Sequence, residues 1–131
     1  TRAPQWTHGG VALGPKPRSY RIELNKGIKR AAMFSALSSK VANNEMIVVD
    51  NITATEYKTK DMVKMLSAVG AAKKTLVVLP EVNNFVIKSC ANIEGVKTTQ
   101  WNTINVYDIL NCDTLIVAQS AVAKIEEVYA R

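Results

Sequence analysis

Residues 75–80 read Thr-Leu-Val-Val-Leu-Pro, a continuous apolar run that a proline ends. A run of this length without polar alternation is typical of a strand buried on both sides. Similar runs at 46–50 and 114–118, and a weaker one at 96–99, predict three more strands. Because parallel neighbours need long crossover connections, four such strands separated by helical segments predict a parallel sheet covered on both faces.

The segments before, between and after these runs carry helical periodicity. Helices are expected at 28–42, 60–69, 84–90, 106–110 and from 121 onward. Their large apolar residues share one side and are expected to face the sheet. In the three longest helices these residues are Met33, Phe34, Leu37 and Val41; then Met62, Val63, Leu66 and Val69; then Val122, Ile125 and either Val128 or Tyr129.

Residues that favour helix ends flank several of these segments. Thr59 and Ser120 are predicted to cap the helices that follow them, and Gly70 is expected just past a helix end. Asn105, with Asp108 three residues later, resembles a capping box. These signals support helix boundaries close to the residues named.

The predicted fold class is α/β, a small doubly wound, mostly parallel sheet flanked by helices, with an extended basic N-terminal arm. A length of 131 residues with 47% hydrophobic residues suits one compact domain. We therefore predict an arm over residues 1–25 and a globular α/β domain over residues 26–131. The arm is punctuated by glycine and proline and shows no periodicity, so it should be extended and mobile until a partner holds it.

Positive charge is concentrated at one end of the chain. Residues 1–40 hold eight basic residues and one acidic residue, a surplus of +7, whereas the other 91 residues hold nine basic and ten acidic ones, a net charge of −1. Such a local surplus indicates a polyanionic partner for the N-terminal part. Three of the cations, Lys26, Lys29 and Arg30, fall at the expected start of a helix, where the helix dipole disfavours positive charge unless an anion is near.

Composition argues against membrane and metal functions. The longest purely apolar stretches, 46–49 and 76–79, are far shorter than the roughly 20 residues that cross a bilayer, and the first residues lack a secretory h-region. We therefore expect a cytoplasmic protein without a membrane partner. Cys90 and Cys112 have neither metal-ligand spacing nor a histidine cluster, so small buried thiols are expected, with a disulfide left open.

No motif for catalysis is present in the sequence. The glycines Gly9, Gly10 and Gly14 precede every predicted strand, so they cannot form a dinucleotide or P-loop fingerprint, and we expect no cofactor. Asp50, at the end of a predicted strand, motivates the alternative of a nucleotide-binding or receiver-like α/β enzyme domain, although an ordinary strand-end residue is the simpler interpretation. His8, the single histidine, accompanies no nucleophile motif. Paired acids at 126–127 are expected to face solvent on the last helix.

Several motifs follow one another along nearly the whole chain. They are Ala3-Pro4-Gln5-Trp6, Gly9-Gly10-Val11, Gly14-Pro15-Lys16-Pro17-Arg18-x-Tyr20, Lys29-Arg30, Ser35-Ala36-Leu37-Ser38, Ile47-Val48-Val49-Asp50, Lys58-Thr59-Lys60, Leu76-Val77-Val78-Leu79-Pro80, Asn92-Ile93-Glu94-Gly95-Val96 and Asn105-Val106-Tyr107-Asp108-Ile109-Leu110. In this order they resemble the bacterial-type large-subunit ribosomal protein four family, and the last motif is the most diagnostic.

The resemblance implies a structural constituent of the large ribosomal subunit that is not an enzyme. It implies an arm reaching through large-subunit ribosomal RNA toward the peptide exit tunnel, a role in early assembly, and neighbouring large-subunit proteins as further partners. Arginine forks suit phosphate oxygens and aromatic rings suit splayed bases, the combination that folded RNA favours. The RNA-binding candidates are Arg2, Gln5, Trp6, His8, Lys16, Arg18, Tyr20, Arg21, Lys26, Lys29 and Arg30.

Two departures from the family pattern limit what carries over. The family commonly has Trp-Arg-Gly-Gly-Gly where this sequence has Trp-Thr-His-Gly-Gly at 6–10, and whether His8 replaces the missing arginine contact is left open. The family's N-terminal part, including its glycine- and arginine-rich loop tip, has no counterpart, so an incomplete N-terminus is expected. Some relatives regulate their own messenger RNA, but no residue here distinguishes that activity. An organellar ribosome also remains an alternative location.

Overall fold

Helices and strands alternate from residue 26 onward in the structure, a computed structural model that describes residues 2–129 apart from the side chain of Tyr129. The elements are α1 (Lys26–Ala42), β1 (Met46–Val49), α2 (Thr59–Val69), β2 (Thr75–Leu79), α3 (Asn84–Ala91), β3 (Val96–Gln100), α4 (Val106–Asn111), β4 (Thr114–Ala118) and α5 (Gln119–Tyr129). All four predicted strands and all five predicted helices are present, with boundaries shifted by at most two residues.

The four strands form one parallel sheet in the order β1-β4-β2-β3. Every residue of the two central strands, β2 and β4, is buried, as the continuous apolar runs predict. The prediction of a buried strand is wrong for β1, which lies at the sheet edge with β4 as its neighbour. Its residues are half-buried, apart from Val48, whose side chain is 53% exposed.

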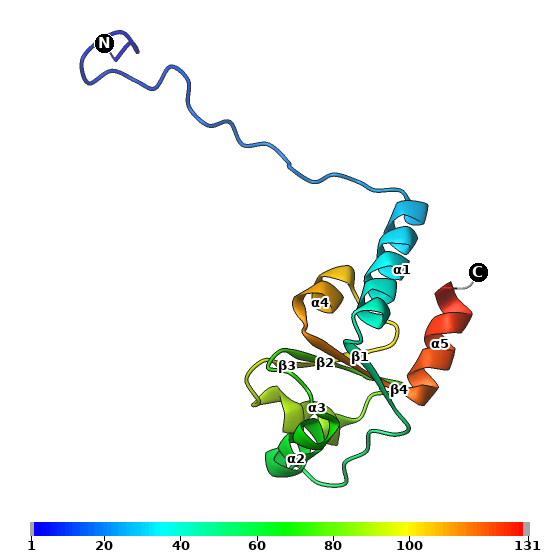
Figure 1. Cartoon of the computed structure of the whole chain (residues 1–131). Coiled ribbons are helices and arrows are strands. Elements are labelled where there is room, and N and C mark those ends of the chain that lie inside the picture. Colours follow the sequence, from blue (N-terminus) through cyan, green and yellow to red (C-terminus); the bar gives the residue numbers. More distant parts are fainter. Residues whose placement is uncertain (1, 130–131) are drawn as a thin grey trace.

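Helices cover both faces of the sheet, so the doubly wound α/β class is confirmed. Figure 1 shows α2 and α3 on one face and α1, α4 and α5 on the other. Contacts join α1 to α4 and α2 to α3, in agreement with this layering. The connections through α2 and α3 run in one direction across the sheet and the connection through α4 returns. Right-handed crossovers then place α4 on the opposite face.

Several expectations about helix faces and caps are wrong. Three side chains expected to face the sheet are largely exposed: Phe34 (45%), Val41 (59%) and Val63 (48%). Val128 is exposed as well, and the side chain of Tyr129 lies outside the described residues. On α1 the apolar sector is wider than the sheet can cover, so its buried residues are Met33 and Ala36, with the amphipathic Lys40.

Thr59 and Ser120 do not cap helices. Thr59 is the first residue of α2, and Lys58 occupies the N-cap with φ −126° and ψ 111°. Ser120 lies inside α5, because this helix begins at Gln119 directly after β4. A capping side chain must precede the first helical residue, so neither hydroxyl can serve.

Two other end signals are confirmed. Gly70 ends α2 in the left-handed conformation, at φ 72°. Asn105 caps α4: its Oδ1 accepts from the Asp108 amide at 2.7 Å, and its Nδ2 donates to Asp108 Oδ2 at 2.8 Å. Lys97 donates to both Asp108 carboxylate oxygens at 2.7 Å, which ties β3 to α4. The motif at 105–110, the most diagnostic one in the sequence, is therefore the hydrogen-bonded start of α4.

The polar side chains at the buried starts of the central strands, β2 and β4, all have hydrogen-bond partners. Thr75 Oγ1 donates to the Ala72 carbonyl at 2.8 Å, and Thr114 Oγ1 accepts from the Ala72 amide at 3.1 Å. Lys40, which is also buried, donates to the Cys112 carbonyl and to Glu45 Oε2, both at 2.5 Å. This lysine joins α1 to the segments that precede β1 and β4, a role that its sequence position does not indicate.

Both cysteines are free and buried, as predicted. Burial raises the pKa of the Cys90 thiol above its ordinary value. Burial also raises the pKa of the Cys112 thiol, although the nearby charge of Lys40 partly opposes the shift. Both groups therefore remain neutral thiols at neutral pH.

We expect both thiols to resist alkylation at pH 8 in the folded protein and to react readily in urea, because the thiolate is the nucleophile and burial disfavours it. Because the pKa of each thiol is higher in the folded chain than in the unfolded chain, the neutral thiols also add to the free energy of unfolding. This contribution is complete at pH values below the pKa of the unfolded chain. That contribution should be lost as pH rises above about 8.5. Mass spectrometry of the alkylated protein measures the first effect, and urea unfolding at several pH values measures the second. Rapid native alkylation of both residues would contradict the burial described.

Candidate nucleic-acid interface

Residues 2–25 contain no helix or strand, and Figure 1 shows them leading away from the globular part at the start of α1. No backbone hydrogen bond links residues 11–24 to the rest of the described chain. Residues 2–10 differ from the expected extended conformation, because hydrogen bonds fold them into a closed loop. In this loop the Trp6 amide donates to the Ala3 carbonyl at 3.0 Å, and the Gly10 amide donates to the Arg2 carbonyl at 2.8 Å.

All eleven RNA-binding candidates are exposed. Trp6 lies in the loop with 62% of its surface accessible, and Tyr20 lies further along with 76% accessible. The guanidinium of Arg18 lies 4.6 Å from the centroid of the Tyr20 ring, so a cation and a flat aromatic surface are presented together. His8 lies in the loop with a left-handed backbone, at φ 60°. The remaining candidates are Arg2, Gln5, Lys16, Arg21, Lys26, Lys29 and Arg30.

The start of α1 continues this basic surface. The first turn holds no acidic residue, and the side chain of Asn25 at the N-cap makes no capping hydrogen bond. Lys26, Lys29 and Arg30 are exposed around it. Because the helix dipole adds positive potential at the same end, an anion bound there would be stabilised by the amides and by the side-chain charges together.

The alternative interpretation is a nucleotide site at the carboxyl ends of the strands. The observation that favours it is a hollow at this position. A hollow of about 690 Å³ lies there, lined by residues 51–55 and 79–85. Asp50 is exposed beside it and does not line it. In the part of the chain that is described, no three residues of the metal-ligating types His, Cys, Asp and Glu come together. Glu81 is the one charged residue that lines the hollow, and no lysine or arginine lines it to hold a phosphate.

One exposed cluster on the globular part escapes sequence reasoning. The rings of Tyr57 and Phe85 lie 4.6 Å apart between centroids, and Lys88 Nζ lies 5.3 Å from the Tyr57 centroid. These residues come from the segment before α2 and from α3. The large sequence separation between Tyr57 and Phe85 explains why no local motif reveals the cluster. It combines aromatic and cationic groups as the arm does.

The model of the ribosomal protein L4/L1 family matches residues 1–128, almost the whole chain. The chain belongs to this family. The L4/L1 assignment agrees with the motif series along the arm and the sheet, and the predicted family membership is thereby confirmed.

Curated relatives of this L4/L1 chain are named large ribosomal subunit protein uL4. The relative from Clostridium perfringens is 55% identical over 129 residues, and that from Clostridium novyi is 52% identical over the same length. The relative from Clostridium acetobutylicum is 54% identical. Each match covers 98% of this chain and 62% of the relative. The L4/L1 chain thus spans less than two thirds of the length of these relatives.

None of the helices in the described part of the chain is both long enough and apolar enough to span a bilayer.

Proposed function

We propose that this chain is a structural constituent of the large ribosomal subunit that binds large-subunit ribosomal RNA through residues 2–30, and that it is not an enzyme. The proposal divides the chain as the sequence does, into an RNA-binding arm over residues 1–25 and a globular domain over residues 26–131. It rests on family membership and on the names of the relatives, which are large-subunit proteins.

One observation carries the RNA-binding part of the proposal. The eleven candidate residues are exposed along the arm and the first turns of α1, and the only acid among residues 1–40 is Glu23. A cationic segment of this kind gains affinity from a polyanion, because binding releases counterions from the phosphates. Arginine and lysine contacts to phosphates would set the position of the arm, while Trp6 and Tyr20 supply surfaces on which unpaired bases can stack.

The same proposal extends to the place of the arm in the particle. An arm of about 25 residues spans several tens of ångströms when extended, at about 3.3 Å per residue, which is sufficient to pass between RNA helices. We propose that it reaches toward the peptide exit tunnel and helps the RNA to fold early in assembly. The globular domain would then lie against neighbouring large-subunit proteins. No observation favours binding to its own messenger RNA.

The direct test is association with ribosomal particles. Tagged protein expressed in a bacterium should cosediment with large subunits and their precursors at moderate salt, and it should be absent from small subunits. Deleting residues 2–25 should release the globular domain into the unbound fractions while it remains folded by circular dichroism. Equal cosedimentation of the deleted protein would assign RNA binding to the globular domain and contradict the role of the arm.

A further inference from the structure

Residues 2–10 form a small closed loop at the end of the arm, which Figure 1 shows away from every helix and strand of the described chain. Backbone hydrogen bonds of 2.8–3.0 Å close it, and the one that spans the most residues runs from the Gly10 amide to the Arg2 carbonyl. A Cβ on Gly9 would lie 2.0 Å from the Ala3 carbonyl oxygen, so the closed backbone requires glycine there. The loop therefore has a conformation of its own, held by its backbone.

His8 is the residue of this loop whose backbone is left-handed, at φ 60°, and its side chain is exposed. Histidine and asparagine adopt this conformation more readily than most residues. The hydrogen bond between Gly10 and Arg2 holds the Arg2 backbone next to the segment that carries His8. Because an imidazole gains a positive charge between about pH 8 and pH 5, the loop carries one cationic side chain at the upper end of this range and two at the lower end.

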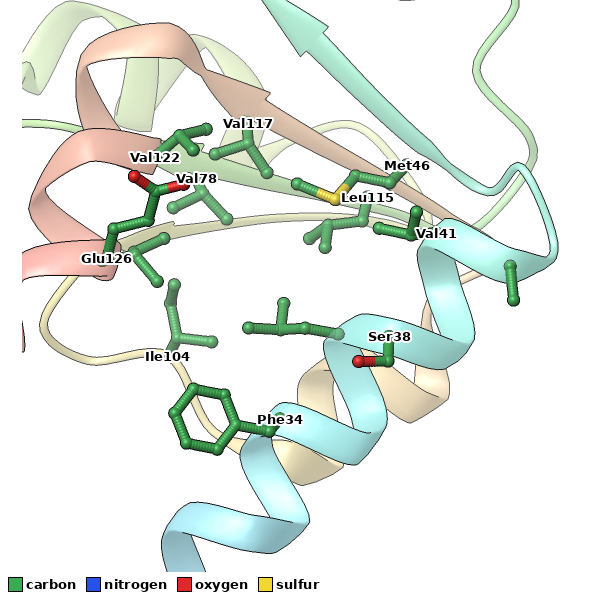
Figure 2. Close-up of a pocket in the computed structure, with 13 residues that line it drawn as sticks. Phe34, Ser38, Val41, Met46, Val78, Ile104, Leu115, Val117, Val122 and Glu126 are labelled. Atoms are coloured by element: carbon green, nitrogen blue, oxygen red, sulfur yellow. The ribbon is translucent and has the colours of Figure 1, made fainter. Parts of the chain in front are cut away.

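The other titratable groups of the described chain lie away from the loop. Arg2 is the only other charged side chain among residues 2–15, and the nearest acid along the chain is Glu23. The carboxylates of the globular part lie beyond the far end of the arm. Glu126, for example, lines an apolar groove of about 520 Å³ between α1 and α5, which Figure 2 shows. A protonated His8 therefore has no carboxylate of the described chain beside it, and an external anion is needed to neutralise it.

We propose that the closed loop is a pH-sensitive phosphate contact, in which His8, after taking a proton from solvent, binds a phosphate group of the RNA beside Arg2. The inference rests on the RNA binding of the arm proposed above. A phosphate next to the imidazole stabilises its protonated form, so protonation strengthens binding and binding favours protonation. The closed backbone limits the distance between the two cations. Trp6, which is 62% exposed on the same loop, offers a ring on which an adjacent base can stack.

The test compares RNA binding at pH 8 and pH 5.5. One phosphate contact adds about 0.7–0.9 to the slope of log affinity against log salt, which corresponds to about four- to sixfold in affinity at 0.15 M salt. The wild-type chain should therefore bind transcribed large-subunit ribosomal RNA about four- to sixfold more tightly at pH 5.5, with a slope steeper by about 0.7–0.9. Fluorescence anisotropy across a salt series measures both quantities. The chain is acetylated at its amino terminus, so that the α-amino group does not titrate in this range.

Two variants assign the pH effect to His8. His8→Asn keeps a residue that tolerates the left-handed backbone and cannot be protonated, so its affinity should change by less than about twofold between the two pH values. His8→Arg carries a permanent charge and should bind at pH 8 about as tightly as the wild-type chain does at pH 5.5. A pH effect of wild-type size in His8→Asn would overturn the inference.

Two glycine variants test the loop without changing any charge. Gly9→Ala opens the loop, because the added Cβ would lie 2.0 Å from a backbone oxygen, whereas a Cβ on Gly14 meets only the side chain of Val11, at 3.3 Å. Gly9→Ala should reduce the pH effect to less than about twofold, and Gly14→Ala should leave it at about four- to sixfold. An undiminished effect in Gly9→Ala would refute the role of the closed loop.

Failure of this inference is distinguishable from failure of the proposed function. Wild-type binding that is equally strong at both pH values, with equal salt slopes, would overturn the pH-sensitive contact and leave RNA binding by the arm intact. Absence of RNA binding at both pH values would overturn the two together.

Discussion

Replacing Lys16, Arg18, Arg21 and Lys26 together with glutamine is expected to weaken binding to large-subunit RNA by about 200- to 1000-fold at 0.15 M salt. Each phosphate contact contributes about 0.7–0.9 to the slope of log affinity against log salt, so four lost contacts reduce the slope by about 2.8–3.6. All four side chains are exposed and lie outside the core, so the fold should be unchanged. Filter binding or fluorescence anisotropy across a salt series gives both values.

The matched control removes the same charge from the globular part. Lys60, Lys64, Lys73 and Lys74 are also exposed, and replacing all four with glutamine leaves the arm intact. This variant should bind RNA within about fivefold of the original protein, because exposed charges far from the contact are screened over about 8 Å at this salt. Equal weakening by both variants would show that net charge, and not the arm, determines affinity.

Gly95→Ala is expected to destabilise the fold by about 2–4 kcal/mol. Gly95 has φ 80°, and a Cβ added there would lie 2.2 Å from the Lys73 carbonyl oxygen. The Gly95 carbonyl also accepts from the Thr75 amide at 3.0 Å, next to the start of β2. Relief of the clash must therefore move the backbone at the point where β2 and β3 begin. Urea unfolding followed by circular dichroism measures the loss.

Gly70→Ala separates the clash from backbone strain alone. Gly70 has a similar φ of 72°, but a Cβ added there meets no atom within 4 Å. We expect this substitution to cost about 1 kcal/mol, the strain of a left-handed alanine. A loss for Gly95→Ala no larger than that for Gly70→Ala would mean that the backbone near Lys73 yields easily.

Patterns within a few consecutive residues were sufficient to predict the strands of the sheet. The runs at 75–79 and 114–118 are fully apolar or β-branched because both of their sides are buried, and such runs are visible without any knowledge of contacts. The Asn105 cap is equally local, since its partner Asp108 lies three residues away. Sequence reasoning placed these elements correctly for that reason.

Features that depend on distant parts of the chain were missed. The exposure of Val48 follows from the strand order, which places β1 at the edge, and a sequence run does not reveal that order. Lys40 looks like an ordinary surface cation, yet its partner Cys112 lies 72 residues away. Phe34 and Val41 look like core residues, and they line a groove instead. In the candidate interface, charge and exposure could be predicted, but the hydrogen-bonded loop over residues 2–10 could not.

Amide hydrogen exchange of residues 11–25, with and without large-subunit RNA, tests the central claim most directly. Residues 11–24 make no backbone hydrogen bonds to the globular part in the described structure, so the amides of the arm should exchange within seconds in the free protein and become protected when RNA is added. Amides in β2 and β4 should be protected in both states and serve as the internal reference. Protection of the arm in the free protein, or unchanged rapid exchange in the complex, would contradict an arm that RNA orders.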